Sequence, residues 1–147
     1  EKEEIYREWI RDGGIRAIPG AIEFIRRSRE LGLLCAIGSS APRANVDLCV
    51  RALGLEREFH ATVSGEDVMR GKPAPDIFLA AAGALRAPPA ECVVFEDAPA
   101  GIAAAHAAGM RAVALATSHP PGELAGADRL ATDFTELDPR RLRDGED

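Results

Sequence analysis

The sequence lacks the features that mark secreted proteins, membrane proteins and metal-cluster proteins. Its 147 residues include only three cysteines, and these form no Cys-x-x-Cys pair. The three are Cys35, Cys49 and Cys92. Cys35 and Cys92 lie in apolar runs typical of strands, so we expect buried, reduced thiols rather than disulfides. No apolar run approaches the length of a membrane span, and the charged N-terminus is no signal peptide. These absences favour a cytoplasmic protein that has no membrane partner.

The sequence also has fewer basic than acidic residues. The sequence has 18 Lys and Arg residues against 24 Asp and Glu residues, which gives a net charge of −6. Nucleic acids and anionic membrane surfaces require a broad basic field, so we expect neither as a partner. A small anionic substrate would need a local positive site within an acidic molecule. The hydrophobic content of 46% is enough for the core of one domain.

Apolar runs alternate with helical patterns along most of the chain. Short strands buried on both faces are predicted at residues 33–37, 61–63, 92–95 and 112–115. Helices are predicted at residues 3–12, 19–31, 43–53, 75–85 and 98–108, several of them ending at a glycine. This alternation predicts an α/β fold with a Rossmann-like, doubly wound and mostly parallel sheet. The charged tail that starts at Asp138 is expected to fray.

Polar residues follow two of the predicted strands, at the end where open parallel sheets bind ligands. Ser39 and Ser40 follow the 33–37 run, and a hydroxyl with free backbone N–H groups suits an anionic oxygen. Helix capping explains the same serines and is the stronger local interpretation. Glu96 and Asp97 follow the 92–95 run, and adjacent carboxylates attract a hard cation such as Mg²⁺. Stabilisation of the next helix N-terminus explains them equally well.

Two basic residues are candidates for contacting an anion. Lys72 lies in the segment 71–76, Gly-Lys-Pro-Ala-Pro-Asp, where two prolines restrict the backbone and direct the ammonium group. Arg43, four residues after Ser39, is a second candidate for phosphate binding, although a solvent-facing helix position explains it as well. The histidines show no spacing typical of metal ligands, and we expect surface positions for His60, His106 and His119.

Taken in order, these segments closely resemble the haloacid dehalogenase-like (HAD) hydrolases. The similarity is strongest to the subfamily that includes β-phosphoglucomutase and phosphoglycolate phosphatase. It is carried by the strand that ends in Ser-Ser, by Gly-Lys-Pro-Ala-Pro-Asp-Ile-Phe at 71–78, and by Val-Val-Phe-Glu-Asp-Ala-Pro-Ala-Gly-Ile at 93–102. The resemblance implies that residues 19–147 form the α/β core and that residues 1–18 are a remnant of a helical cap and linker.

The resemblance also implies a role for each residue. Ser39 would be the catalytic hydroxyl that binds phosphate, with the backbone N–H of Ser40 beside it. Lys72 would neutralise the phosphoryl oxygens and the nucleophile. Glu96 and Asp97 would hold Mg²⁺, Asp97 more directly. The implied reaction is phosphoryl transfer through an aspartyl-phosphate, in a phosphatase or phosphomutase acting on a small phosphorylated metabolite.

One motif of the family is missing. An Asp-x-Asp-Gly segment normally supplies the attacking aspartate and the general acid and base, and this sequence contains no such segment. Its strand would lie between the 33–37 and 92–95 strands, so we expect a sheet that is incomplete at the N-terminus. An uncovered strand edge would invite self-association. We expect the chain alone to be inactive and to be a piece of a longer protein.

Three functional hypotheses stay open. The favoured hypothesis is a fragment of an active phosphatase or phosphomutase, because the remaining motifs are intact. A second is a non-catalytic relative that binds phosphorylated ligands or a partner. The third is a true haloacid dehalogenase, which is disfavoured because such enzymes generally carry Ser-Asn and a later Asp where this chain has Glu96-Asp97.

Overall fold

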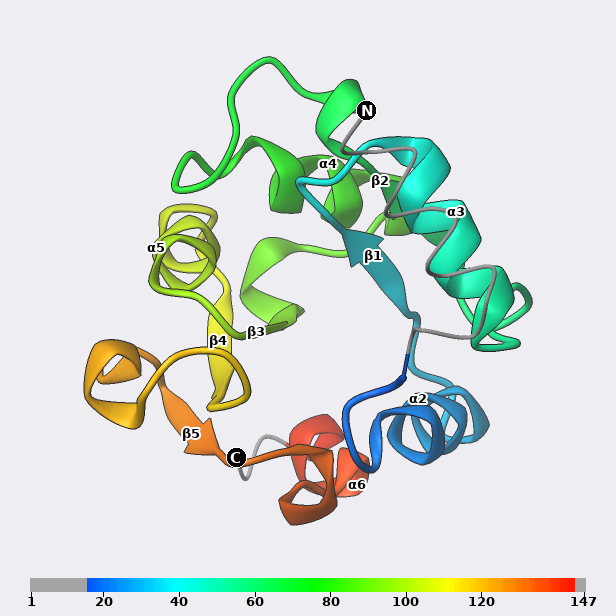
Figure 1. Ribbon diagram of the computed structural model, residues 1–147, viewed down its shortest axis with the longest axis vertical. Coiled ribbons are helices and arrows are strands. Elements are labelled where there is room, and N and C mark those ends of the chain that lie inside the picture. Colours follow the sequence, from blue (N-terminus) through cyan, green and yellow to red (C-terminus); the bar gives the residue numbers. More distant parts are fainter. Residues whose placement is uncertain (1–15, 145–147) are drawn as a thin grey trace.

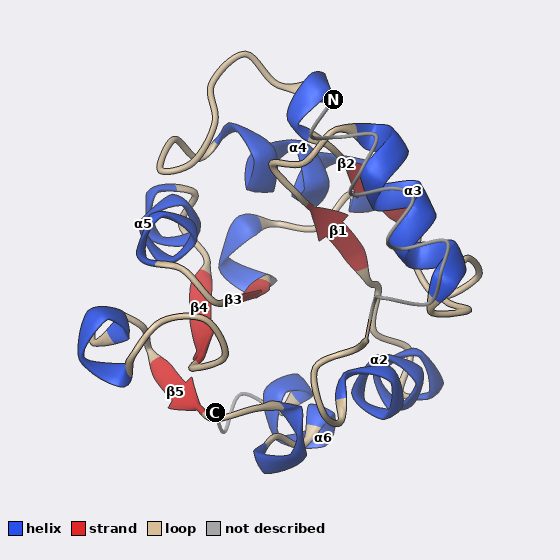
Figure 2. Cartoon of the chain, in the orientation of Figure 1, coloured by secondary structure: helices blue, strands red, loops and turns tan. Residues whose placement is uncertain are grey.

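The computed structural model describes residues 16–144, which form parallel strands in two groups with helices packed against them (Figures 1 and 2). In the first group β1 pairs with β2, and in the second the order is β3-β4-β5. Every pairing is parallel, as predicted. The strands are β1 (Ala36–Gly38), β2 (Ala61–Val63), β3 (Val93–Glu96), β4 (Arg111–Leu115) and β5 (Arg129–Ala131).

Helices alternate with the strands along most of the described chain, as expected for an α/β fold. They are α2 (Ala21–Glu30), α3 (Arg43–Ala52), α4 (Asp76–Leu85), α5 (Pro99–Ala107) and α6 (Pro139–Arg143). Gly32 and Gly54 follow α2 and α3 with φ of 81° and 69°, the left-handed conformation that glycine adopts after a helix. The helix predicted at 3–12 lies outside the described residues. No helix within residues 16–144 is long and apolar enough to cross a membrane.

Strand β4 is buried on both faces, which explains its continuous apolar sequence. Ala112 and Ala114 pack in one core cluster with Ile102 of α5. Val113 and Leu115 point to the opposite face and pack in a second cluster with Phe24 of α2. Side chains alternate along a strand, so a strand covered by helices on both sides needs apolar residues at every position. The doubly wound arrangement is therefore confirmed around β4.

The sheet is interrupted between β1 and β3. Each of these strands is paired on one side, and no strand of the described part of the chain lies between them. A cavity of about 390 Å³ lies beside this interruption, with an apolar lining that includes Ile37 of β1, Ile25 of α2 and Val46 of α3. The interruption falls where the missing Asp-x-Asp-Gly strand was expected.

The first predicted strand is shorter than expected, because its opening residues make other hydrogen bonds. The N–H of Leu33 donates to the Ser28 carbonyl at the end of α2, and the N–H of Cys35 donates to Nδ1 of His60. The ladder therefore begins only at Ala36. All three cysteines are free thiols, as expected. Cys35 and Cys92 are half-buried and lie just before β1 and β3, so the expected full burial within strands is wrong for both.

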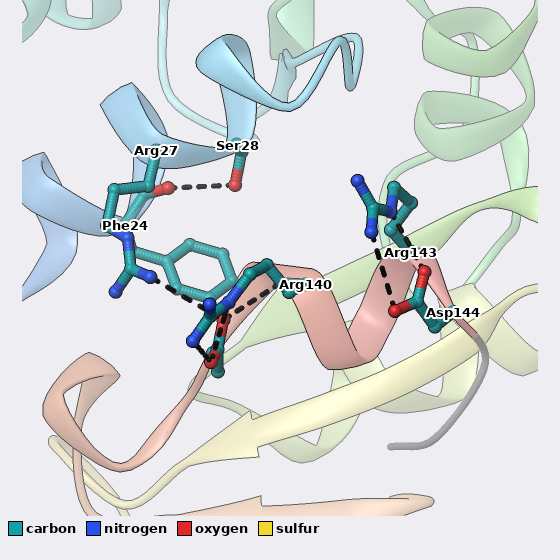
Figure 3. A network of polar contacts seen from close by, with 7 residues as sticks. Phe24, Arg27, Ser28, Arg140, Arg143 and Asp144 are labelled. Carbon is teal, nitrogen blue, oxygen red and sulfur yellow. Dashed lines mark hydrogen bonds and ion pairs between the residues drawn. The ribbon is translucent and has the colours of Figure 1, made fainter.

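The expectation of a frayed tail is wrong for residues 138–143. Asp138 caps α6 by accepting a hydrogen bond from the N–H of Arg140 at 2.9 Å. The guanidinium of Arg140 also donates to Asp138 at 2.9 Å, and Arg27 of α2 lies 3.8 Å from the same carboxylate. Figure 3 shows α6 beside α2, with Arg140 near Arg27 and Phe24. Capping and charge pairing across two helices hold this segment in place.

This cap predicts a pH-dependent contribution to stability. The guanidinium and N–H of Arg140 lower the pKa of Asp138 from 3.8 to about 2. The ionised Asp138 therefore stabilises the folded chain above about pH 4, and this contribution is lost as the pH falls toward 2. Urea unfolding should show that Asp138→Asn, which keeps a capping side chain, is less stable than the wild type at pH 6 but not at pH 2.

The control for this experiment is Asp47→Asn. Asp47 is an exposed residue of α3 that makes no ion pair or hydrogen bond with another described side chain. Its substitution removes one negative charge without touching α6. If the stability difference between Asp138→Asn and the wild type is the same at pH 6 and pH 2, the Asp138 cap is not the source.

Candidate active site

Five of the predicted site residues line one cavity at the carboxyl ends of β1 and β3. The cavity measures about 490 Å³, and its lining includes Ser39, Ser40, Lys72, Glu96 and Asp97. They come from three separate segments of the sequence. The parallel strands bring these segments together, because the chain leaves every strand at the same edge of the sheet.

Lys72 connects the two groups of strands. Its ammonium nitrogen lies 3.2 Å from the carbonyl oxygen of Gly38, the last residue of β1, and 3.1 Å from Oε2 of Glu96, the last residue of β3. The ring of Phe78 lies 4.9 Å from the same nitrogen. The side chains of Lys72 and Glu96 are only 14% and 13% exposed, so this is a largely buried ion pair. It places a fixed positive charge at the floor of the cavity.

The loop after β1 offers hydrogen-bond donors to the cavity. The hydroxyl oxygen of Ser39 accepts a hydrogen bond from the N–H of Ala41 at 3.2 Å, which leaves the hydroxyl proton available for another acceptor. The N–H of Ser40 has no acceptor among residues 16–144. A hydroxyl and a free N–H beside a buried ammonium group form a suitable environment for phosphate oxygens.

The turn after β2 packs closely against the Ser39–Ser40 loop. A Cβ atom on Gly65 would lie 2.4 Å from the carbonyl oxygen of Ser40, closer than any side chain tolerates. Ser64 is fully buried, and its N–H donates to Asp67 at 2.8 Å, which closes the turn. Any side chain at position 65 would therefore displace the Ser40 loop.

Arg43 does not line the cavity. Its guanidinium forms an ion pair with Asp67 and donates to the carbonyl of Thr62 at 3.0 Å. The hydrogen bond from the N–H of Ser64 and the adjacent Arg43 guanidinium hold the pKa of Asp67 below its ordinary value. Arg43 therefore ties α3 to the turn after β2. Its expected contact with phosphate stays a prediction.

Sequence reasoning missed two residues beside Asp97. The hydroxyl of Ser118 donates to Oδ2 of Asp97 at 2.6 Å, and Nδ1 of His119 lies 2.9 Å from the Asp97 carbonyl oxygen. Both residues follow β4, the strand next to β3. The rule that identified Ser39 and Asp97, a polar residue just beyond a strand, also applies to this loop. His119 was considered only for metal-ligand spacing between histidines, which it lacks, and this strand-end rule was not applied to it.

Gly101 of α5 makes room for Glu96. A Cβ atom at position 101 would lie 1.5 Å from Oε2 of Glu96, so Gly101→Ala must displace this carboxylate from Lys72. We expect phosphate binding to be lost and stability to fall by about 1–3 kcal/mol. Gly83→Ala in α4 is the matched control, because its Cβ would meet nothing within 4 Å. That substitution should instead stabilise the chain by about 1 kcal/mol.

Isothermal titration with phosphate and urea unfolding would measure both effects. The two variants carry the same chemical change in two helices of similar length. If Gly101→Ala binds phosphate as the wild type does, the position of Glu96 does not govern the cavity.

A family model for haloacid dehalogenase-like hydrolases matches residues 2–109. This match covers most of the chain, and the fold and the strand-end cavity agree with it. The chain belongs to the haloacid dehalogenase-like hydrolase family.

Similar proteins indicate the subfamily to which this chain belongs. Protein CbbY of Rhodobacter capsulatus is 38% identical over 125 residues, which cover 83% of this chain and 55% of that protein. The beta-phosphoglucomutase of Bacillus subtilis (strain 168) is 40% identical over 101 residues, 69% of this chain and 43% of the enzyme. These similarities support membership of the β-phosphoglucomutase- and phosphoglycolate phosphatase-like subfamily. The chain spans about half the length of these relatives.

A solved structure shows the same fold. A mutant of CbbY from Rhodobacter sphaeroides in complex with xylulose-(1,5)bisphosphate has a TM-score of 0.83 and 32% sequence identity. The similar region covers 89% of this chain and 60% of that chain. The Rossmann-like α/β fold expected from the sequence is therefore confirmed.

Proposed function

We propose that this chain forms the phosphate- and magnesium-binding part of a phosphatase or phosphomutase that acts on a small phosphorylated metabolite. The observation that carries this proposal is the largely buried ammonium group of Lys72, which shares a cavity with the Ser39 hydroxyl. Fixed donors and a buried cation stabilise the charge that develops on a transferring phosphoryl group. Relatives named for sugar-phosphate chemistry support this substrate class.

Magnesium would be held mainly by Asp97. Oδ2 of Asp97 accepts from Ser118, whereas Oδ1 has no hydrogen-bond partner among the described residues. Glu96 is engaged by Lys72, so we propose that it orients the lysine more than it binds the metal. Within residues 16–144 no three His, Cys, Asp or Glu residues form a metal-binding group. A single carboxylate still fits Mg²⁺, which keeps several waters and binds substrate phosphates.

The metal, when bound, would neutralise charge on the phosphoryl oxygens. Lys72, the Ser39 hydroxyl and the Ser40 N–H would hold those oxygens in place. The attacking carboxylate would come from an Asp-x-Asp-Gly strand inserted between β1 and β3. It would form a bond to phosphorus while the bond to the leaving oxygen breaks, and the second aspartate would give that oxygen its proton.

Phosphate binding by the purified chain tests directly whether this chain forms the phosphate-binding part of the site. In isothermal titrations with inorganic phosphate and Mg²⁺, Ser39→Ala should weaken binding about tenfold, the effect of losing one hydrogen bond to a charged group. Ser40→Ala is the matched control, because the proposed contact of Ser40 uses its backbone N–H, and its binding should not change. Equal affinities for the wild type and Ser39→Ala would contradict the assignment.

A non-catalytic relative is the second candidate function. It applies if the native protein, with its upstream residues, also carries no Asp-x-Asp-Gly segment. Such a protein would bind phosphate in the titration above and show no turnover with its native upstream sequence attached. A haloacid dehalogenase is disfavoured, because Glu96-Asp97 matches the metal-binding type of site.

A further inference from the structure

We propose that Ser118 and His119 are positioning residues that hold Asp97 in the orientation that binds the divalent cation. This inference rests on the proposed function, because it concerns the residue to which that proposal assigns the metal. Ser118 and His119 do not line the cavity themselves. They act through Asp97 and not on the substrate.

The hydrogen-bond directions in this cluster follow from the chemistry of the atoms. An ionised carboxylate only accepts, so the hydroxyl of Ser118 is the donor to Oδ2 of Asp97. The distance of 2.6 Å is typical of a hydroxyl that donates to a charged oxygen. A backbone carbonyl also only accepts, so Nδ1 of His119 carries the hydrogen that it shares with the Asp97 carbonyl at 2.9 Å.

Nδ1 of His119 also lies 3.3 Å from the Ser118 hydroxyl oxygen, which links the two positioning residues. Asp97 is therefore held at two points: its carboxylate by Ser118 and its backbone carbonyl by His119. The rotation of the carboxylate is restricted, and Oδ1 is the oxygen left without a partner among the described residues. A fixed carboxylate with one available oxygen is what a cation ligand requires.

Asp97 does not serve the alternative role of a helix cap. The N-cap position of α5 is Ala98, and no side chain accepts a hydrogen bond from the first turn of this helix. The contacts of the Asp97 side chain among the described residues lead instead to the loop after β4. Asp97 therefore gives α5 no capping hydrogen bond, and its negative charge beside the helix N-terminus is compatible with cation binding.

The sheet brings these residues together from distant parts of the sequence. Glu96 pairs with Ala114 in the parallel ladder between β3 and β4. Each strand then continues past the same edge, which places Ser118 and His119 over the residue that follows β3. Ser118 is an exposed residue, so the core does not depend on its hydroxyl. Its substitution should leave the fold intact and alter only Asp97.

Manganese binding provides a readout that does not depend on catalysis. Mn²⁺ replaces Mg²⁺ at oxygen sites, and the paramagnetic resonance signal of the free ion reports its binding to the purified chain. Ser118→Ala and His119→Ala should each weaken Mn²⁺ binding about tenfold, the lower end of the range for outer residues of metal sites. Ser118→Thr, which keeps the hydroxyl, should bind within twofold of the wild type. His119→Asn, which keeps an N–H donor, should recover most of the affinity.

Thr117→Ala is the matched control, because it removes an exposed hydroxyl from the same loop without a contact to Asp97. If Ser118→Ala and His119→Ala bind Mn²⁺ like the wild type while Asp97→Asn does not bind, the positioning role is wrong and the metal site stands. A loss in Ser118→Ala that Ser118→Thr fails to recover also overturns the positioning role. If the wild type binds no Mn²⁺, or Asp97→Asn binds equally, the proposed metal site fails and this inference fails with it.

Discussion

Replacing Lys72 with Met is expected to destabilise the chain by about 2–4 kcal/mol and to abolish phosphate binding. The methionine keeps an unbranched side chain against Phe78 but leaves the Glu96 carboxylate without its cation. Glu96 is only 13% exposed, and removing one partner of a buried ion pair leaves a costly unpaired charge. Urea unfolding at pH 7 would measure the stability loss, and titration with phosphate would measure the binding loss.

A double variant separates the two effects. Lys72→Met combined with Glu96→Gln removes both charges, so most of the lost stability should return while phosphate binding stays absent. Arg70→Met is the matched control, because the Arg70 side chain in the Arg70–Asp76 ion pair is 70% exposed, so its loss should change the stability little. A Lys72→Met variant as stable as the wild type would show that the Lys72–Glu96 pair contributes no stability.

The unpaired edges of β1 and β3 are expected to exchange amide hydrogens rapidly in this chain. When the native upstream sequence supplies an Asp-x-Asp-Gly strand, we expect that strand to lie between β1 and β3, so their free N–H groups gain carbonyl partners. Hydrogen exchange measured on peptides covering 33–39 and 92–97 should then slow by roughly tenfold or more. Exposed edges should also promote concentration-dependent self-association of the 147-residue chain.

Strand β4 serves as the internal control for the exchange experiment. It is paired on both sides, with β3 and with β5, so its exchange should change little when the additional strand is present. If peptides 33–39 and 92–97 exchange equally fast in the 147-residue chain and in the chain with its native upstream sequence, no strand enters between β1 and β3.

The parts of the fold predicted correctly are those that local sequence determines. Helices α3 and α4 were located within one residue at each end, because prolines precede both and Gly54 follows α3. The buried strand β4 was found because its apolar run serves two covered faces. The site residues at the ends of β1 and β3 were found by the same logic, since parallel strands end at one edge.

The parts that were missed depend on contacts between distant segments. Strand β5 is only three residues, Arg129–Ala131, and it exists through its pairing with β4. Helix α6 has five residues and a charged sequence, and its order comes from the Asp138 cap and the contact with Arg27. His119 reaches Asp97 through the register of β3 and β4, which no local pattern records.

Hydrolysis of a generic aryl phosphate with Mg²⁺ tests the central proposal most directly. The assay compares the purified 147-residue chain with the same chain carrying its native upstream sequence. The chain alone should show no turnover, because the attacking carboxylate is absent. The extended protein should hydrolyse the ester and should lose roughly 10³-fold or more of that rate when the first Asp of its Asp-x-Asp-Gly becomes Asn. Turnover by the 147-residue chain alone, or an active extended protein without that motif, would contradict the proposal.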